Sequence, residues 1–210
     1  MTLQITTFIL GPLENNTYLL ADPDTRRAVL IDPSFESERA LETIERLKFE
    51  LTEIWLTHAH FDHIAGASVA RRFNPTPKTG LHAEDLPLWR QAGGAFDWGL
   101  QIDPGPEPEI FFSHGQQLKL GNSTIEVRHV PGHTPGHVMF YIAEERLAFV
   151  GDVIFYHGIG RTDLPGSDFR QLINSIQTQV LTLPPETTLL SGHGPETTVA
   201  EERVNNPFLR

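Results

Sequence analysis

The chain contains no cysteine among its 210 residues. Disulfide bonds are therefore excluded, and any transition-metal site must be built from histidine and carboxylate ligands. Long apolar runs are also missing, since no segment approaches the roughly 20 apolar residues that a membrane helix needs. The N-terminal residues have neither a basic start nor an apolar stretch. We therefore expect no signal peptide and no membrane partner, and we expect a soluble, cytoplasmic protein.

Positive charge is scarce. Lys and Arg number 16 against 27 Asp and Glu, which gives a formal net charge of −11. An acidic surface repels phosphate backbones, so we expect no nucleic-acid partner and no RNA-processing activity. A small anionic substrate is still compatible with this charge if a local cation receives it. The remaining composition, 39% hydrophobic and 20% charged, is typical of globular proteins. We expect residues 1–210 to form a single domain.

Hydrophobic spacing and turn residues divide the chain into two groups of strands, each followed by helices. Strands are expected at 4–10, 17–21, 27–32, 53–57, 78–82, 109–113, 123–130, 137–142, 147–150 and 188–191. Helices are expected at 37–47, 62–73, 83–91, 169–181 and 197–204. This order predicts an α+β fold with two sheets inside and helices outside. The glycine- and proline-containing segment 93–109 is expected to be a loop, either a substrate wall or a surface insertion.

The stretch LTHAHFDHIAG, residues 56–66, concentrates three histidines and a carboxylate after an apolar strand. Side chains two positions apart on an extended segment face the same way, so His58 and His60 can reach one spot. Asp62 and His63 fall in the first turn of a helix and diverge, so they can serve a second spot nearby. Asp62 alone could instead be a helix cap. Four such groups packed without a metal would carry a desolvation cost, which favours two cations side by side.

Further candidate ligands occur where other strands end in glycine-containing loops. His133 lies in PGHTPGH, Asp152 lies in FVGDVIF, and His193 lies in LLSGHGPET. Glycine lets the backbone approach a metal closely, because it has no side chain. The repeated placement of ligand-type residues at strand ends predicts one common site.

In this order, THAHFDHIAG, GHTPGH, GD and SGHG resemble the motifs of the metallo-β-lactamase superfamily, and in particular its short bacterial glyoxalase II (hydroxyacylglutathione hydrolase) branch. The resemblance runs from about residue 11 to the C-terminus. It implies an αββα sandwich, in which two mixed β-sheets pack face to face with helices outside. It also implies two divalent metal ions, with zinc preferred over iron or manganese. The implied ligands are His58, His60 and His133 for the first ion, Asp62, His63 and His193 for the second, and Asp152 as the bridge.

The activity implied by the resemblance is hydrolysis of a thioester such as S-D-lactoylglutathione or a related hydroxyacyl thioester. Two cations can share a hydroxide that attacks the carbonyl, and can stabilise the oxyanion. No protein nucleophile is then needed, which agrees with the absence of cysteine and of a GxSxG motif. Asp62 is a candidate for orienting the water as well as for binding metal.

The substrate partner is expected to be a small anionic thioester. Arg161, in GIGRTDLPG, matches the basic residue that contacts glutathione in the glyoxalase II family, and it could pair a substrate carboxylate. A surface ion pair with Asp163 or Asp168 is the alternative. Asp163 replaces a tyrosine of that family, and the longer enzymes continue into extra C-terminal helices that this sequence does not include. Both differences weaken the case for glutathione thioesters. His157 is a second candidate for the pocket.

A persulfide dioxygenase is the main alternative, because that branch shares the fold and a similar GRTD loop. It would hold a single non-haem Fe(II) with His58, His133 and Asp152. The SGHGPET segment resembles the hydrolases more closely, which favours hydrolysis. The histidines without ligand spacing are expected to have other roles: support of the loop by hydrogen bonding for His137, and surface or core positions for His82, His114 and His129. The sequence does not predict the oligomeric state.

Overall fold

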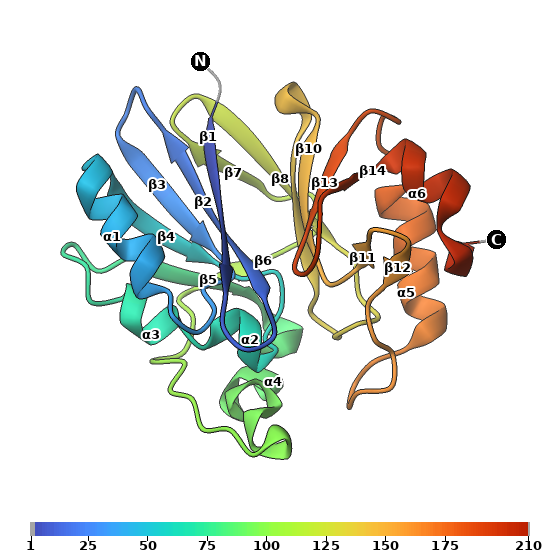
Figure 1. Ribbon diagram of the computed structural model, residues 1–210, viewed down its shortest axis with the longest axis horizontal. Coiled ribbons are helices and arrows are strands. Elements are labelled where there is room, and N and C mark those ends of the chain that lie inside the picture. The colour runs from blue at the N-terminus through green and yellow to red at the C-terminus, as the bar shows by residue number, and fades with distance from the viewer. Residues whose placement is uncertain (1–2, 210) are drawn as a thin grey trace.

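Two six-stranded β-sheets form the centre of the computed structural model, which describes residues 3–209 (Figure 1). The first sheet has its strands in chain order: β1 (Gln4–Leu10), β2 (Asn15–Asp22), β3 (Arg27–Ile31), β4 (Glu50–Trp55), β5 (Lys78–His82) and β6 (Ile110–Phe112). The second sheet has the order β14 (Thr197–Thr198), β13 (Thr188–Ser191), β10 (Leu147–Gly151), β9 (Val138–Ile142), β8 (Ser123–His129) and β7 (Gln117–Leu120). Both sheets contain parallel and antiparallel pairs.

Helices cover the outer faces of both sheets (Figure 1). The first sheet packs against α1 (Glu38–Leu47), α2 (Phe61–Ile64), α3 (Ala67–Ala70) and α4 (Leu86–Arg90) through one apolar cluster. The second sheet packs against α5 (Phe169–Ser175), its π-helical continuation Ile176–Val180, and α6 (Val199–Asn205). A third apolar cluster, which includes Trp55 and Phe140 with their ring centroids 5.3 Å apart, fills the space between the sheets. The expected αββα sandwich is therefore confirmed.

The predicted helix 62–73 is wrong in its middle, because the chain forms α2 and α3 with a break between them. Gly66 lies in the break, and its N–H donates to the carbonyl of Pro33. A β-carbon at this position would lie 2.3 Å from the Ser34 carbonyl oxygen and 2.4 Å from the Ser37 hydroxyl oxygen. The contact with this distant loop ends the helix, and it depends on the missing side chain.

Several short elements were not predicted from the sequence. β7 pairs with β8 in a hairpin, and β11 (Ile154–Phe155) pairs with β12 (Gly158–Ile159) in a separate two-stranded sheet. The predicted helix 83–91 begins as a 3-10 turn, Ala83–Asp85, before α4. Segment 93–109 is not a loop throughout, because Ala92–Trp98 forms 3-10 turns interrupted at Gly93 and Gly94, both with positive φ.

The two sheets are tied together at the end of the sandwich where β3, β4, β10 and β13 terminate. The N–H of Val138 donates to the carbonyl of Thr57, and the N–H of Asn16 donates to the carbonyl of Gly192. The carboxyl ends of adjacent parallel strands meet at one edge of a sheet, so β10 and β13 deliver their following loops to the same place. All of the candidate ligands follow strands that end here.

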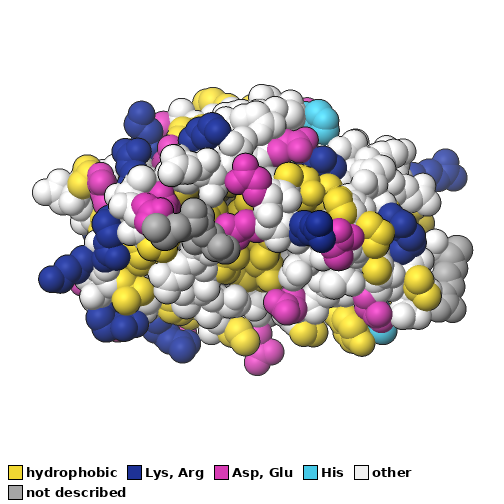
Figure 2. Space-filling view, turned by 90° about the horizontal axis from the view of Figure 1, so that it is seen from above, with side chains coloured by type: hydrophobic (Ala, Val, Ile, Leu, Met, Phe, Trp, Pro, Cys, Tyr) yellow, Lys and Arg dark blue, Asp and Glu magenta, His cyan; other side chains and the backbone are white. Residues whose placement is uncertain are grey.

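The surface carries both signs of charge. On the face shown in Figure 2, Lys and Arg side chains are interspersed with Asp and Glu side chains. Within residues 3–209, we find no helix with the length and apolarity that crossing a bilayer would require.

Candidate metal centre

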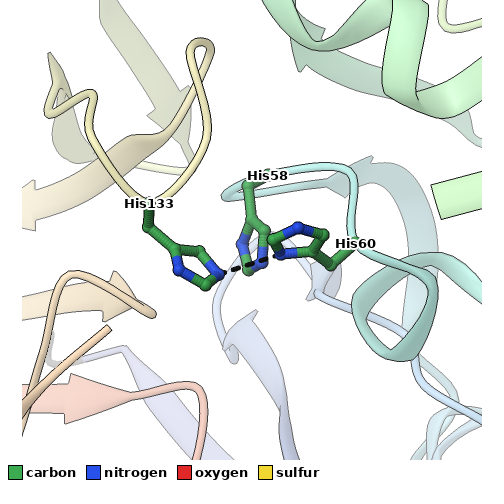
Figure 3. Close-up of side chains that lie close together, drawn as sticks. All are labelled: His58, His60 and His133. Carbon is green, nitrogen blue, oxygen red and sulfur yellow. Dashed lines mark hydrogen bonds between the residues drawn. The ribbon is translucent and has the colours of Figure 1, made fainter. Parts of the chain in front are cut away.

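The first group of candidate ligands is formed by His58, His60 and His133 (Figure 3). His58 and His60 come from the segment after β4, and His133 comes from the loop between β8 and β9. One ligand atom from each residue lies within 4.8 Å of the others. His60 Nδ1 and His133 Nε2 are only 2.9 Å apart. The structure therefore brings together the three residues that the resemblance assigns to a first metal.

A hydrogen bond to the side chain of Thr57 fixes the orientation of His58. Its Nδ1 lies 3.0 Å from the Thr57 hydroxyl oxygen, which in turn donates to a carboxylate oxygen of Asp32 at 2.7 Å. Because the Thr57 proton is engaged by Asp32, the hydroxyl oxygen accepts from His58 Nδ1–H. The lone pair of His58 then lies on Nε2, on the opposite side of the ring.

Other candidate ligands are oriented in the same way. His133 Nδ1 lies 2.8 Å from the Arg161 carbonyl oxygen, and His193 Nδ1 lies 2.9 Å from the Leu13 carbonyl oxygen. A carbonyl can only accept, so each Nδ1 is the donor, and in the neutral imidazole Nε2 keeps the lone pair. His63 Nδ1 donates to Asp32 at 3.0 Å. Such outer contacts select the tautomer that binds a metal through Nε2.

The second group contains Asp62, His63 and His193, again with ligand atoms within 4.8 Å of one another. One carboxylate oxygen of Asp62 lies 3.1 Å from His193 Nε2 and 3.6 Å from His63 Nε2. These residues come from α2 and from the loop after β13. They are the residues that the resemblance assigns to a second metal.

Asp152 lies between the two groups. Its Oδ2 is 3.6 Å from Nε2 of His133, in the first group, and 3.7 Å from Nε2 of His193, in the second. Its Oδ1 is 3.4 Å from His63 Nε2. Gly192 permits this approach, because a β-carbon there would lie 2.2 Å from Asp152 Oδ1. The carboxylate is therefore within reach of both groups.

Among the candidate ligands, two buried side-chain atoms lack a hydrogen-bond partner within the described residues. They are His58 Nε2 and Asp152 Oδ1. Burying such atoms without a partner is costly, so their presence at one place calls for a bound group. A neutral imidazole nitrogen and a carboxylate oxygen are donors that suit a divalent transition-metal ion. The residues present therefore fit metal ions.

Electrostatics differ between the two groups. Burial lowers the pKa of His60 to about 3, and it also lowers the pKa values of His58 and His133. These imidazoles are neutral at pH 7 and can donate lone pairs. Burial opposes charge on His63 and His193 as well, but nearby carboxylates outweigh it and raise the pKa values of both. Burial raises the pKa of Asp152, yet the net shift is downward because of His63 and its other histidine neighbours.

Acidification is expected to release metal from the Asp62, His63 and His193 group before the other group. Protons compete with metal at a higher pH where the histidine pKa values are raised, and at a lower pH where they are lowered. The measurement is metal per chain after equilibration at stepwise lower pH. The His193→Ala variant, which retains the first group, should follow only the more acid-resistant step. If the wild type released the metal of the His58, His60 and His133 group first, the assignment would be contradicted.

A pocket of about 380 Å³ opens onto the centre. Its floor is formed by His60, Asp62, His133, Asp152 and His193. Its walls are largely apolar: Leu13, Phe61, Leu88, Trp98, Phe155, Leu164 and Pro165. Residues 93, 94, 97 and 98 contribute to the lining, so the first part of segment 93–109 is a pocket wall.

Arg161 lines this pocket and is the one Lys or Arg among its described lining residues. The guanidinium contacts both carboxylate oxygens of Asp163 at 2.9 Å and lies 5.7 Å from the centre of the Trp98 ring. The ion pair that was the alternative role for Arg161 is therefore present. His157 is not among the described residues that line the pocket. Its Nε2 lies 2.7 Å from Glu201, which disagrees with its expected place in the pocket.

The remaining histidines lie outside the two groups. His137 stacks on His58 with ring centroids 4.6 Å apart, and its Nε2 accepts from the Asp152 N–H. This is the placement expected of a supporting residue. His82 and His129 stack 4.2 Å apart with nearly parallel rings and lie near Glu84. In-plane lone pairs of parallel stacked rings do not converge on one ion, so this arrangement does not make a second metal centre.

The sequence motifs gave no signal for Asp32 and Asp85, two buried carboxylates that contact the ligand-bearing loops. Asp32 accepts from both the N–H and the hydroxyl of Thr57 at 2.7 Å. Asp85 accepts hydrogen bonds from the N–H of Ala59, next to His58, and from the hydroxyl of Thr134, next to His133. Outside the motifs, Asp32 comes directly after an apolar strand, as several candidate ligands do, and this position could have drawn attention to it.

The fold and the paired histidine–carboxylate groups at the edge of the sandwich define a class of metal-dependent enzymes. The model of the metallo-β-lactamase superfamily matches residues 10–193, and the chain belongs to this superfamily. A relative from Haemophilus influenzae, named hydroxyacylglutathione hydrolase GloC, is 39% identical over 198 residues, which cover 93% of each chain.

Two solved structures also superpose closely on this chain. A structure described as BLEG-1 B3 metallo-β-lactamase superposes with a TM-score of 0.90 at 36% identity, covering 98% of this chain and 99% of that one. A di-iron-bound form of TTHA1623 superposes with a TM-score of 0.88 at 40% identity, covering 97% of this chain and 100% of that one. The similarity therefore extends over nearly the whole chain.

Proposed function

We propose that the protein is a hydrolase of small anionic thioesters that uses two divalent metal ions. The observation that carries the proposal is the position of Asp152 between two groups of candidate ligands. His58, His60 and His133 would hold one ion, Asp62, His63 and His193 the other, and Asp152 would contact both. Zinc, iron and manganese all suit these donors, and the di-iron form of TTHA1623 is a relative with two ions.

Bound ions would supply an acidified water and a Lewis acid for the substrate carbonyl. Asp62 places a carboxylate oxygen beside His63 and His193, where it can hold a water proton as well as contact an ion. The pocket walls are largely apolar, so a substrate bound between them would displace water from around its reacting carbonyl. No serine lines the pocket within the described part of the chain, which agrees with attack by an activated water and not by a serine nucleophile. A thioester suits such a site, because a thiolate departs without protonation.

The substrate is proposed to be a hydroxyacyl thioester with an anionic group. The name of the Haemophilus relative supports this class. Arg161 would receive the anionic group, since it is the cation of the described pocket lining and its guanidinium can form paired hydrogen bonds with a carboxylate. The substrate would have to displace Asp163 from this residue.

The direct test is hydrolysis of S-D-lactoylglutathione, with metal per chain determined on the same sample. Turnover with about two metals per chain is the expected result. Two metals without turnover would reject this substrate and keep the metal assignment. A single iron without turnover would favour the persulfide dioxygenase, and oxygen uptake with glutathione persulfide would then be measured.

Replacement of Arg161 by alanine is expected to raise KM for an anionic thioester about tenfold, with a smaller change in kcat. The guanidinium contacts the part of the substrate that does not react, so its loss weakens ground-state and transition-state binding alike. Arg90→Ala is the matched control, because Arg90 forms a similar exposed ion pair with Glu107 and does not line the pocket. An unchanged KM in Arg161→Ala would leave Arg161 with only its ion pair to Asp163.

A further inference from the structure

Asp85 is a fully buried carboxylate that is not a candidate metal ligand and does not line the pocket. It is the last residue of the 3-10 turn Ala83–Asp85 and immediately precedes α4. A buried carboxylate is expensive unless hydrogen bonds satisfy it. The groups that satisfy Asp85 therefore reveal what this residue holds.

Three donors satisfy the Asp85 carboxylate. Oδ2 accepts from the Ala59 N–H at 3.0 Å and from the Thr134 hydroxyl at 2.8 Å. Oδ1 accepts from the Gly136 N–H at 2.7 Å. All three partners donate, so an ionised carboxylate, which only accepts, matches them.

These donors belong to the two loops that carry the first ligand group. Ala59 lies between His58 and His60, and Thr134 follows His133 directly. The first loop leaves the first sheet after β4, and the second connects β8 and β9 of the second sheet. One carboxylate oxygen thus connects the two loops across the junction of the sheets.

The loop that carries His133 packs tightly against Asp85. A β-carbon at Gly136 would lie 2.6 Å from the Asp85 backbone nitrogen and 2.8 Å from its Oδ1. The missing side chain at position 136 allows the loop of His133 to approach this closely.

We propose that Asp85 is a positioning residue of the metal centre, which sets the distance of His133 from His58 and His60 by holding both loops. The inference goes beyond the proposed hydrolysis and does not depend on the substrate, because metal affinity tests it. A purely structural role would lower stability without a specific loss of metal from the first group.

The test compares Asp85→Asn with Glu202→Gln. Asparagine retains one acceptor oxygen but places an NH₂ group against at least one donor. Glu202 is the matched control, because it is equally buried and accepts from the His157 N–H, the Thr197 hydroxyl and the Asn206 amide, on the side of α6. Zinc affinity is measured by chelator competition, and urea unfolding of the metal-free proteins measures stability.

Asp85→Asn is expected to weaken zinc binding by about 10- to 100-fold, the usual range for outer contacts of metal ligands. The same measurement in a His193→Ala background, which retains the first ligand group, assigns the loss to that group. The Co(II) absorption spectrum should also change, since it reports ligand geometry. Glu202→Gln should lose stability but retain wild-type zinc affinity. Wild-type affinity in Asp85→Asn, or an equal loss in both variants, would overturn the proposal.

Thr134→Val keeps the proposal testable if Asp85→Asn does not fold. Valine has nearly the shape of threonine and removes only the hydroxyl donor to Asp85. A smaller loss of zinc affinity in the same direction supports the positioning role. Unchanged affinity in this variant, with the Asp85→Asn protein unfolded, would assign Asp85 to stability alone.

Discussion

Replacement of Asp152 by alanine is expected to abolish stable binding of both metal ions. The carboxylate lies within 3.7 Å of imidazole nitrogens from each ligand group, so both ions would lose a donor at once. Its negative charge, which helps to raise the pKa of His63 in the metal-free protein, would also be lost as an attraction for the cations. Metal per chain, measured after dialysis, should fall from about two to well below one.

Asp152→Asn is the matched variant, because it keeps the size and one oxygen donor of the side chain but loses the charge. It should retain more metal than Asp152→Ala and less than the wild type. Normal metal content in Asp152→Ala would show that this residue does not contact either ion.

Replacement of His58 by alanine is expected to remove metal from the first group and to lower kcat/KM at least about a thousandfold. A Lewis acid contributes several kcal/mol of transition-state stabilisation, and about 4 kcal/mol corresponds to a factor of a thousand. The buried Nε2 of His58 has no hydrogen-bond partner among the described residues, so its lone pair is available to a metal ion and is lost in the variant. Metal per chain and hydrolysis of a thioester are measured on one sample.

His82→Ala is the control for this loss. His82 stacks on His129 outside the two ligand groups, so its removal should leave metal content and activity unchanged. Full activity and full metal content in His58→Ala would refute the role of His58 as a ligand.

The candidate ligands that the structure brings together could be found in the sequence because each has a local signal. His58, His133, Asp152 and His193 all follow a strand, the last three are next to a glycine, and parallel strands such as β10 and β13 bring their ends together. The sandwich could be predicted from the same strands, since their apolar residues divide into two groups followed by helices.

The unpredicted features depend on contacts between distant segments. No feature of the local segment HAEDLP, residues 82–87, singles out Asp85. Its hydrogen-bond donors lie at positions 59, 134 and 136 and meet it only in the folded chain. The break at Gly66 arises from the loop at Pro33 and Ser34, which the helical pattern of 62–73 does not contain. His157 is close to Asp152 in sequence, but the β11–β12 hairpin directs it to Glu201.

The division of the ligands between the sheets has a consequence for the order of folding during synthesis. His58, His60, Asp62 and His63 emerge from the ribosome well before His133, Asp152 and His193. A nascent chain that ends before β13 contains every strand of the first sheet but lacks His193 and the strand that places it. With the proposed ligands, complete metal loading would follow synthesis of the second sheet, and an ion captured earlier would be held by an incomplete set of donors and exchange readily. In the cell, only a chain with a completed second sheet would then hold its full complement of metal.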